Sequence, residues 1–254
     1  MGKWDIDLTG KVALVTGGSR GIGKDIAMAM ATLGAKVAIC GRKQQGLDQA
    51  VTEFKEKGLD VQGRATHIAK SDQVGALFDF IEKEYGGLDL LVNNVGMNIL
   101  TPAVADVEEG LWDKIVETNL KGTFLVCSRA VPFMRKGQGG KIVNITTVAA
   151  RKAAMGMGVY GVAKAGVEML TRVLAVELAS DHINVNAVAP SMVKTGFSQP
   201  FWGDENTLKE LTRTIPMGRI AETADVVGAV LFLCSGLSDF ITGEVITVDG
   251  GAMA

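Results

Sequence analysis

Apolar and polar positions alternate along the chain in a regular order of short strands and amphipathic helices. Seven runs rich in β-branched residues predict strands: KVALVT, KVAIC, DVQGRA, LDLLVNN, KIVNIT, NVNAVAP and EVITVDG. Helical spacing of apolar residues predicts helices over residues 22–33, 44–57, 72–84, 106–134, 159–178 and 225–234. Strands that alternate with helices form a parallel sheet with right-handed crossovers. The pattern therefore predicts an α/β fold of the doubly wound Rossmann type, with seven parallel strands flanked by helices.

Residues 191–219 break this alternation. They include Pro200, Trp202 and Pro216 and contain no strand-like run. Two interpretations are open: the segment is a lid over a substrate site, or it is a connecting loop that packs on a neighbouring subunit. No internal repeat, low-complexity tract or long linker interrupts the chain. We therefore expect residues 1–254 to form a single domain.

The composition narrows the class of protein. Of the 254 residues, 47% are hydrophobic and 32 are glycines, which favours long buried strands and tight turns. A net charge of −2 argues against a nucleic-acid surface. The three cysteines Cys40, Cys127 and Cys234 lie far apart, so they are expected to be small core residues in a reducing compartment. With two histidines in the chain, we expect no metal site.

Both ends of the chain bear on its location. The opening residues, MGKWDIDLTG, lack the apolar core of a signal peptide, and the longest apolar runs, such as VVGAVLFLC, are too short to span a bilayer. The last residues, GAMA, do not match a peroxisomal address. These features predict a cytoplasmic protein with no membrane segment.

A glycine-rich turn, TGGSRGIG, follows the first predicted strand and opens the first helix. Glycines there let the backbone turn tightly and approach a pyrophosphate, whose charge is stabilised by the helix N-terminus. The alternative is a glycine-rich turn without a ligand. We expect this turn to bind a dinucleotide through Gly17, Ser19, Arg20, Gly21, Ile22 and Gly23.

The end of the second strand indicates which dinucleotide is bound. A carboxylate there would accept hydrogen bonds from a ribose 2′-hydroxyl and repel a 2′-phosphate. The chain has Gly41 at this position, followed by Arg42, with Arg20 in the glycine turn. Two guanidinium groups can hold a phosphate, so the sequence predicts NADP(H) as cofactor. Otherwise both arginines are solvated surface charges.

Tyr160 and Lys164 have the spacing of two residues on one face of a helix. An ammonium group about 5 Å from a phenol, at an effective dielectric constant of about 20, changes its ionisation by roughly 3 kcal/mol, or about two pKa units. The pair therefore predicts a phenol with a lowered pKa that acts as a general acid or base.

Thr147 lies thirteen residues before Tyr160, at the carboxyl end of the strand KIVNIT. Ligands of an open parallel sheet bind at such strand ends, and side chains alternate along a strand, so one residue of the Thr146–Thr147 pair should face the site. We expect the hydroxyl of Thr147 to hold the substrate oxygen. Thr146 or a water molecule is the alternative.

Several ordered motifs together resemble the short-chain dehydrogenase/reductase family over essentially the whole chain. They are TGGSRGIG, NNVG at 93–96, Asn119 in TNLKG, the Tyr160/Lys164 pair, and an Ala-Pro dipeptide at 189–190. Within that family, GRKQQ, KTGFSQPFW and FLCS look closest to NADPH-dependent carbonyl and retinal reductases. The chain departs from the family pattern at Val95, Ser191 and Thr147, where alanine, glycine and serine are usual.

The resemblance implies an NAD(P)(H)-dependent oxidoreductase that is usually a homotetramer. Tyr160 would be the acid/base residue, and Lys164 would lower its pKa and bind the nicotinamide ribose. Asn119 would support a water relay to Lys164, and Thr195 would contact the carboxamide. The remaining cofactor-binding positions on this basis are Asn94, Gly96, Pro190 and Val193.

Two functional hypotheses follow. In the first, the protein is a reductase that transfers a hydride from NADPH to a ketone or aldehyde, or runs the reverse alcohol oxidation. In the second, it binds the cofactor but is weakly active or inactive and serves assembly with an active homologue. The presence of Asn119, Tyr160 and Lys164 favours the enzyme. AAMGMG at 153–158, with Met192, Phe197, Phe201 and Trp202, suggests an apolar substrate site.

Overall fold

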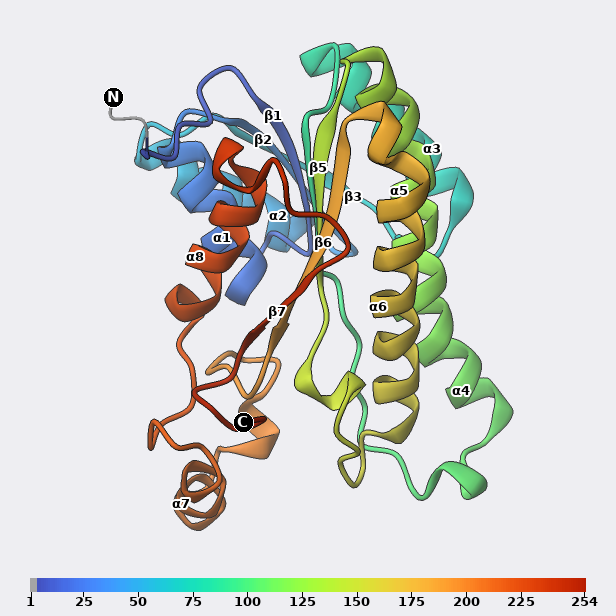
Figure 1. The fold of residues 1–254 in the computed structure, drawn as a ribbon, viewed down its shortest axis with the longest axis vertical. Helices are drawn as coiled ribbons and strands as arrows, with labels where there is room; N and C mark the ends of the chain where they lie inside the picture. The colour runs from blue at the N-terminus through green and yellow to red at the C-terminus, as the bar shows by residue number, and fades with distance from the viewer. Residues whose placement is uncertain (1–3) are drawn as a thin grey trace.

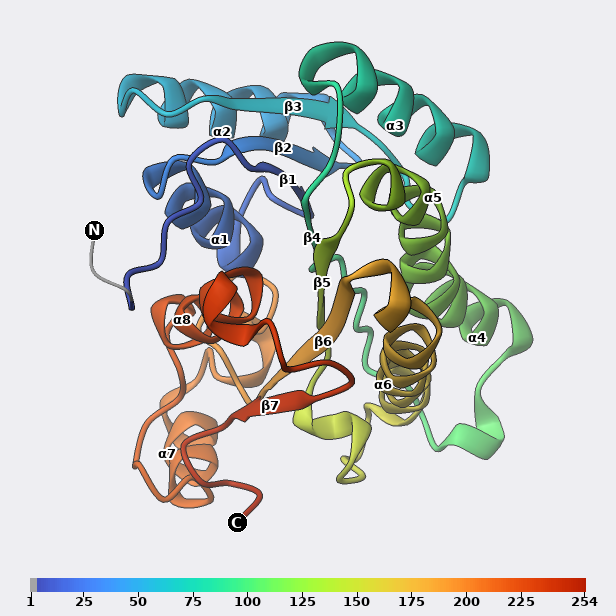
Figure 2. The same ribbon diagram turned by 45° about the horizontal axis from the view of Figure 1, so that its top comes forward.

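A computed structural model describes residues 4–254, which form one parallel sheet with helices on both faces (Figures 1 and 2). The strand order across the sheet is β3-β2-β1-β4-β5-β6-β7. The strands are β1 (Val12–Thr16), β2 (Lys36–Gly41), β3 (Val61–Ala65), β4 (Leu90–Asn93), β5 (Gly140–Ile145), β6 (Ile183–Pro190) and β7 (Val245–Val248). All seven coincide with predicted runs, and the order reverses direction between β1 and β4. The predicted doubly wound Rossmann-type fold is confirmed.

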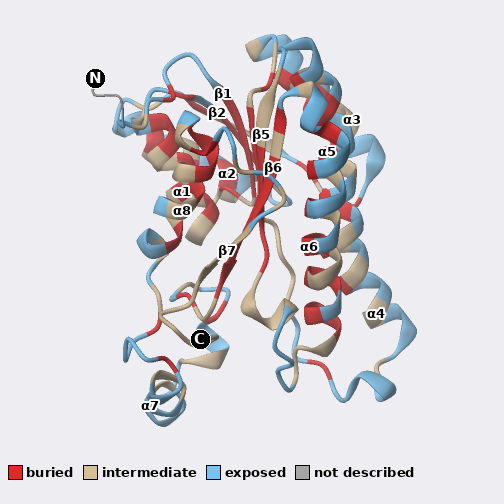
Figure 3. Cartoon of the chain, in the orientation of Figure 1, coloured by how far each residue is buried: buried red, intermediate tan, exposed pale blue. Residues whose placement is uncertain are grey.

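The helices divide between the two faces of the sheet, as Figures 1 and 2 show. On one face lie α1 (Gly21–Thr32), α2 (Gln44–Glu56) and α8 (Thr223–Cys234). The other face is covered by α3 (Ser71–Tyr85), α5 (Gly122–Lys136) and α6 (Gly158–Leu178), with α4 (Glu109–Val116) packed against α6. Buried residues of α1, α2 and α8 pack into one core, and buried residues of α3, α5 and α6 pack into another (Figure 3).

The run Val12–Val15 of the central strand β1 is apolar at every position because both of its faces are buried. Along β1, Ala13 and Val15 pack into the core beneath α1 and α8, whereas Val12 and Leu14 pack into the core beneath α3 and α5. Successive side chains of a strand point to opposite faces, so a strand between two helical layers needs an unbroken apolar run. Cys40, Cys127 and Cys234 are unpaired and buried in these cores, as predicted.

The helical stretch predicted over residues 106–134 is not one helix. A 3₁₀ turn at Val104–Asp106 precedes α4, and a π turn at Glu117–Lys121 separates α4 from α5. The side-chain amide of Asn119 donates to the backbone oxygen of Ile115, and the hydroxyl of Thr123 donates to that of Asn119. π turns of this kind are frequent at functional sites because they redirect one side chain without ending the helix.

The segment 191–219 contains a helix that the apolar pattern does not predict. It comprises a 3₁₀ turn at Gln199–Phe201 and α7 (Glu205–Arg213), whose N-terminus is capped by Asp204. The segment is tied down at its base by a bridge between Val193 and Ala221 and by the Met217 amide, which donates to the Gly250 oxygen. Figure 1 shows α7 beyond the carboxyl ends of the strands. Within residues 4–254, no helix combines the length and apolar character needed to cross a membrane.

Candidate active site

A cavity of about 550 Å³ lies at the carboxyl ends of the strands. Its walls come from the turns after β1, β2, β3, β4, β5 and β6, together with residues of α6, the 191–219 segment and the C-terminus. Most predicted site residues line it: Gly17, Ser19, Arg20, Gly21, Ile22, Arg42, Asn94, Gly96, Thr147, Tyr160, Lys164, Pro190, Val193 and Thr195. The other two, Gly23 and Asn119, do not line the cavity. Gly23 packs against Asn94 and Asn119 is bonded to Met97, and both of these partners line it.

The glycine turn is held in place by Asn94. Gly17 and Gly21 have φ angles of +69° and +56°, which side chains with a Cβ rarely adopt. The Asn94 amide donates to the backbone oxygens of Thr16 and Gly17 over 3.0 and 3.4 Å. A Cβ on Gly23 would lie 2.4 Å from Asn94 Nδ2. Gly23 is therefore required for packing, and Asn94 shapes the turn.

Positive charge gathers where β2 ends. Arg20 and Arg42 are exposed and line the cavity on either side of Gly41. A Cβ added to Gly41 would meet only ordinary contacts, with the Leu47 side chain and Ser19 Oγ both at 3.7 Å. Glycine is thus not required here by packing, and the position could hold an acid.

The π turn places Asn119 behind Lys164. The Asn119 amide donates to the Met97 oxygen over 2.8 Å and its oxygen accepts from the Met97 amide over 3.0 Å. A Cβ on Gly96 would lie 3.6 Å from Asn119 Oδ1 and 3.8 Å from Lys164 Nζ. Gly96 therefore lies beside the lysine and leaves room between β4 and α6.

Tyr160 and Lys164 are both buried on α6, and Lys164 Nζ donates to the backbone oxygen of Ile145 over 2.8 Å. The ammonium lies 5.9 Å from the centroid of the Tyr160 ring. Burial raises the pKa of the Tyr160 phenol above its ordinary value and lowers the pKa of Lys164 to about 8. The lowered phenol pKa expected from the spacing is therefore not found in this structure, because burial disfavours the phenolate.

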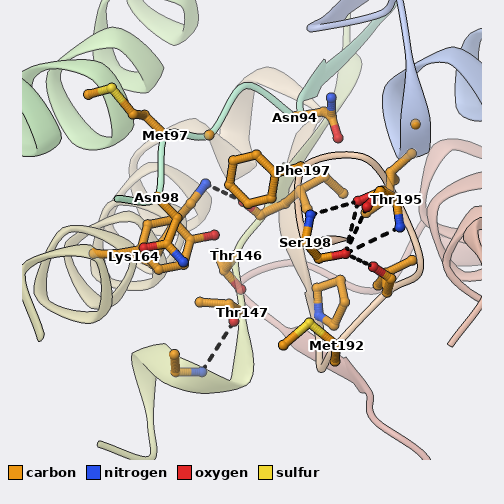
Figure 4. A pocket seen from close by; sticks show the side chains of 18 of the residues that line it. Asn94, Met97, Asn98, Thr146, Thr147, Lys164, Met192, Thr195, Phe197 and Ser198 are labelled. Atoms are coloured by element: carbon orange, nitrogen blue, oxygen red, sulfur yellow. Dashed lines mark hydrogen bonds between the residues drawn. The ribbon is translucent and has the colours of Figure 1, made fainter. Parts of the chain in front are cut away.

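The two threonines at the end of β5, both labelled in Figure 4, have different hydrogen-bond partners. The hydroxyl of Thr146 lies 3.3 Å from the Val188 oxygen and 3.4 Å from Glu168 Oε1. The hydroxyl of Thr147 accepts from the Ala149 amide over 3.2 Å and donates to none of the described residues. Thr147 thus keeps a donor on the cavity side, whereas Thr146 is occupied within the fold.

An ion pair between the buried Glu168 and the exposed Arg151, which sequence reasoning missed, joins the threonine strand end to α6. The Glu168 carboxylate, 5% exposed, accepts from Arg151 Nε over 2.9 Å and from Thr146. Arg151 also donates to the hydroxyl of Thr247 on β7 over 3.2 Å. Glu168 lies seventeen positions after Arg151 in the chain. No local pattern marks such a pair.

Ser198 is a second site residue without a sequence signal. Its hydroxyl accepts from the indole of Trp202 over 2.9 Å and from the Thr195 amide over 3.2 Å, and it donates to the Val193 oxygen. Figure 4 shows the hydrogen bonds between Ser198 and Thr195. Thr195 in turn lies 3.5 Å from the position of a Cβ on Gly21. Ser198 therefore fixes Thr195 against the glycine turn.

The half of the cavity away from the glycine turn has many apolar side chains. The lining side chains there include Met157, Met192, Phe197, Phe201, Leu211, Ile215 and Met253. Leu211 comes from α7, so the 191–219 segment does cover part of this chamber. Trp202, expected among the lining residues, instead anchors the Ser198 hydroxyl, and Met155 is fully exposed.

Comparison with known proteins places this site in a family. A family model described as Enoyl-(Acyl carrier protein) reductase matches residues 17–253. The chain is 41% identical over 249 residues to dehydrogenase/reductase SDR family member 4 of Caenorhabditis elegans, covering 96% of each chain. It is 39% identical to the protein of that name from Homo sapiens, covering 96% of this chain and 88% of that protein. The chain belongs to the short-chain dehydrogenase/reductase family.

A solved structure extends the likeness to a cofactor complex. Gluconate 5-dehydrogenase from Burkholderia cenocepacia, in complex with NADP and tartrate, superposes with a TM-score of 0.93. It is 31% identical, and the match covers 97% of this chain and 96% of that one. As a member of the family, this short-chain dehydrogenase/reductase is an oxidoreductase that uses an NAD(P) cofactor. Its glycine turn suits such a ligand, because Gly17 and Gly21 leave the backbone bare where a dinucleotide would lie.

Proposed function

We propose that this short-chain dehydrogenase/reductase is NADP(H)-dependent and reduces a ketone or aldehyde, or runs the reverse oxidation. The observation that carries the cofactor choice is the end of β2, where Gly41 leaves space and Arg20 and Arg42 line the cavity. Guanidinium groups bind phosphate through paired, charge-assisted hydrogen bonds. The NADP complex of the Burkholderia relative supports the same choice.

The cavity residues that would hold the cofactor run from the glycine turn to Thr195. When bound, NADPH supplies the hydride. Tyr160 donates the proton to the carbonyl oxygen, and Thr147 holds that oxygen through the hydroxyl proton it has free. Lys164 contributes an ammonium group close to the Tyr160 ring. Asn119 holds the backbone at Met97 in place through two hydrogen bonds.

The test of this proposal is NADPH and NADH oxidation against a panel of ketones and aldehydes. We expect turnover with NADPH, and a preference over NADH corresponding to roughly 1 to 3 kcal/mol if one charge-assisted pair decides it. Gly41→Asp, which the packing around Gly41 tolerates, should move the preference towards NADH. Equal or tighter NADH binding by the parent would overturn the cofactor choice.

The same assay tests the alternative of an inactive subunit. Binding of NADPH without oxidation across the whole panel would favour that alternative. A cytoplasmic location is part of the proposal, and cell fractionation tests it.

Assembly into a homotetramer is also proposed, because an apolar face of α6 is exposed. Val162, Met169, Val173 and Val176 lie along one side of this helix, and each is at least 42% exposed. A contiguous apolar face of this kind marks a subunit contact more often than a free surface. Light scattering at micromolar concentration should give four copies, and a monomer would contradict the proposal.

A further inference from the structure

The charged residues that line the cavity all carry positive charge. They are Arg20, Arg42, Lys152 and Lys164, with His67 as the only other titratable side chain besides Tyr160. Among the described residues that line the cavity there is no aspartate or glutamate. The chain as a whole has a net charge of −2, so this local excess of cations is not a property of the overall composition.

Three of these cations have a place in the proposed function. Arg20 and Arg42 lie at the cofactor end, and Lys164 is buried beside Tyr160 and bonded to the Ile145 oxygen. Lys152 is left over. It lies in the turn that follows the 3₁₀ helix Val148–Ala150, and it lines the cavity.

Lys152 differs from the basic residue next to it. Arg151 is held by the Glu168 carboxylate and the Thr247 hydroxyl, at 2.9 and 3.2 Å. The Lys152 side chain is exposed, and no carboxylate of the described residues pairs with its ammonium within 4.0 Å. The fold therefore uses Arg151 in its own packing and leaves the charge of Lys152 at the edge of the cavity.

Lys152 shares the cavity wall with several apolar residues. Ala153, Ala154 and Met157 follow it along the cavity wall, and Met192 and Phe197 line the cavity from the 191–219 segment. An unpaired cation at the rim of an apolar chamber matches a ligand with an apolar body and an anionic end. The apolar side chains exclude water from the body of the ligand, while the ammonium attracts its charge.

We propose that Lys152 is a specificity-determining residue that selects carbonyl substrates carrying a carboxylate on an apolar body. This inference rests on the proposed carbonyl reduction. The carboxylate pairs with the Lys152 ammonium at the rim, and the carbonyl oxygen reaches Thr147 and Tyr160. Because Lys152 is exposed, the pair is screened by solvent, and its effect on kcat/KM is about two- to fivefold.

The experiment compares matched ketones that differ in charge, such as 4-acetylbenzoate and its methyl ester, within a wider set of aryl and alkyl ketone pairs. With saturating NADPH, the ratio of kcat/KM for the acid to that for the ester is measured in the parent and in Lys152→Gln. We expect the variant to lower this ratio about two- to fivefold, mainly through KM. Lys152→Glu should lower it further, and added salt should lower it in the parent only.

Lys36→Gln is the matched control. Lys36 is an exposed lysine at the start of β2, whereas the cavity lies at the carboxyl ends of the strands. Its replacement by glutamine makes the same change in net charge as Lys152→Gln. An acid-to-ester ratio unchanged by both Lys152 variants would overturn this inference while leaving carbonyl reduction intact. A fall in Lys36→Gln equal to that in Lys152→Gln would overturn it too. Absence of turnover with every ketone pair would instead overturn the proposed function.

Discussion

The two halves of the cavity are built in different ways. The cofactor half is closed by buried strand ends and by glycines that admit no side chain: a Cβ on Gly18 would lie 2.4 Å from Ile39, and one on Gly23 would lie 2.5 Å from the Gly17 oxygen. The substrate half includes the apolar side chain of Phe197, which is 43% exposed, and a Cβ on Gly196 would meet nothing within 4 Å.

This difference separates what the fold dictates from what it leaves free. The sheet and its first turn fix where a dinucleotide can lie, because few atoms there can move without disturbing buried neighbours. The substrate wall consists of turns and the short helix α7, which are tied down mainly at their bases. Substitutions in the first half should therefore affect cofactor binding and stability, and those in the second half should change which substrate is used.

Tyr160→Phe should have the largest effect on turnover. The substitution removes the phenolic proton donor and leaves the ring packed on α6. We expect kcat to fall by at least about a hundredfold, with little change in NADPH affinity. Steady-state kinetics and a fluorescence titration with NADPH measure the two quantities separately. Near-normal turnover would assign the proton donor to another group.

Thr147→Ala should cost roughly a hundredfold in kcat, because the substrate oxygen would lose the donor that stabilises it in the transition state. Thr147→Ser keeps the hydroxyl and should retain most activity. Thr146→Ala is the control, since its hydroxyl is bonded to Val188 and lies against Glu168. That variant should lose stability and keep its turnover. The opposite pattern, with slow Thr146→Ala and fast Thr147→Ala, would show that the assumed register is wrong.

Gly23→Ala and Gly196→Ala test the contrast between the two halves directly. The Gly23 methyl group would collide with Asn94 Nδ2 and the Gly17 oxygen, so we expect a loss of about 1 to 3 kcal/mol in unfolding free energy and weaker NADPH binding. Gly196→Ala meets open space and should change neither. Urea denaturation and NADPH titration measure both effects.

A helical control accompanies this pair. Gly75 lies inside α3 with no atom within 4 Å of an added Cβ, so Gly75→Ala should stabilise the protein by about 0.5 to 1 kcal/mol. Equal effects of alanine at Gly23 and Gly196 would show that the two halves of the cavity do not differ in packing.

The strands and the glycine turn could be predicted from the sequence because their signals are local. Apolar runs mark strands buried on both faces, and Gly17 and Gly21 occupy backbone conformations that favour glycine. The π turn at Asn119 could not be predicted in this way, since it depends on bonds to Met97 across the fold. Helix α7 is nine residues long and mostly polar, so its apolar pattern is too short to predict a helix. The Arg151–Glu168 pair joins residues whose spacing in the chain follows no helix or strand period.

The same limit applies to ionisation at the site. The Tyr160/Lys164 spacing is readable, but the effect of burial on both groups depends on the surrounding α6, β5 and β4. Burial has raised the pKa of the phenol, although the charge of the neighbouring lysine alone would lower it. The spacing identifies the pair but carries no information on the burial that raises the pKa of the phenol.

The pH dependence of stability at Lys164 provides a test of this burial. Burial lowers the pKa of its ammonium from 10.5 to about 8, so between those values the unfolded chain binds more protons than the folded protein. Stability contributed by this group therefore rises as the pH rises through this window. From pH 8 to 9.5 we expect a gain of about 1 to 2 kcal/mol relative to Lys164→Met, which cannot titrate. Urea denaturation of both proteins at several pH values measures the difference.

The pH window for this test ends below pH 10, because the raised pKa of Tyr160 has the opposite effect once tyrosines of the unfolded chain ionise. If the difference in unfolding free energy between the parent and Lys164→Met stays constant or falls from pH 8 to 9.5, burial does not lower the pKa of Lys164 in the folded protein.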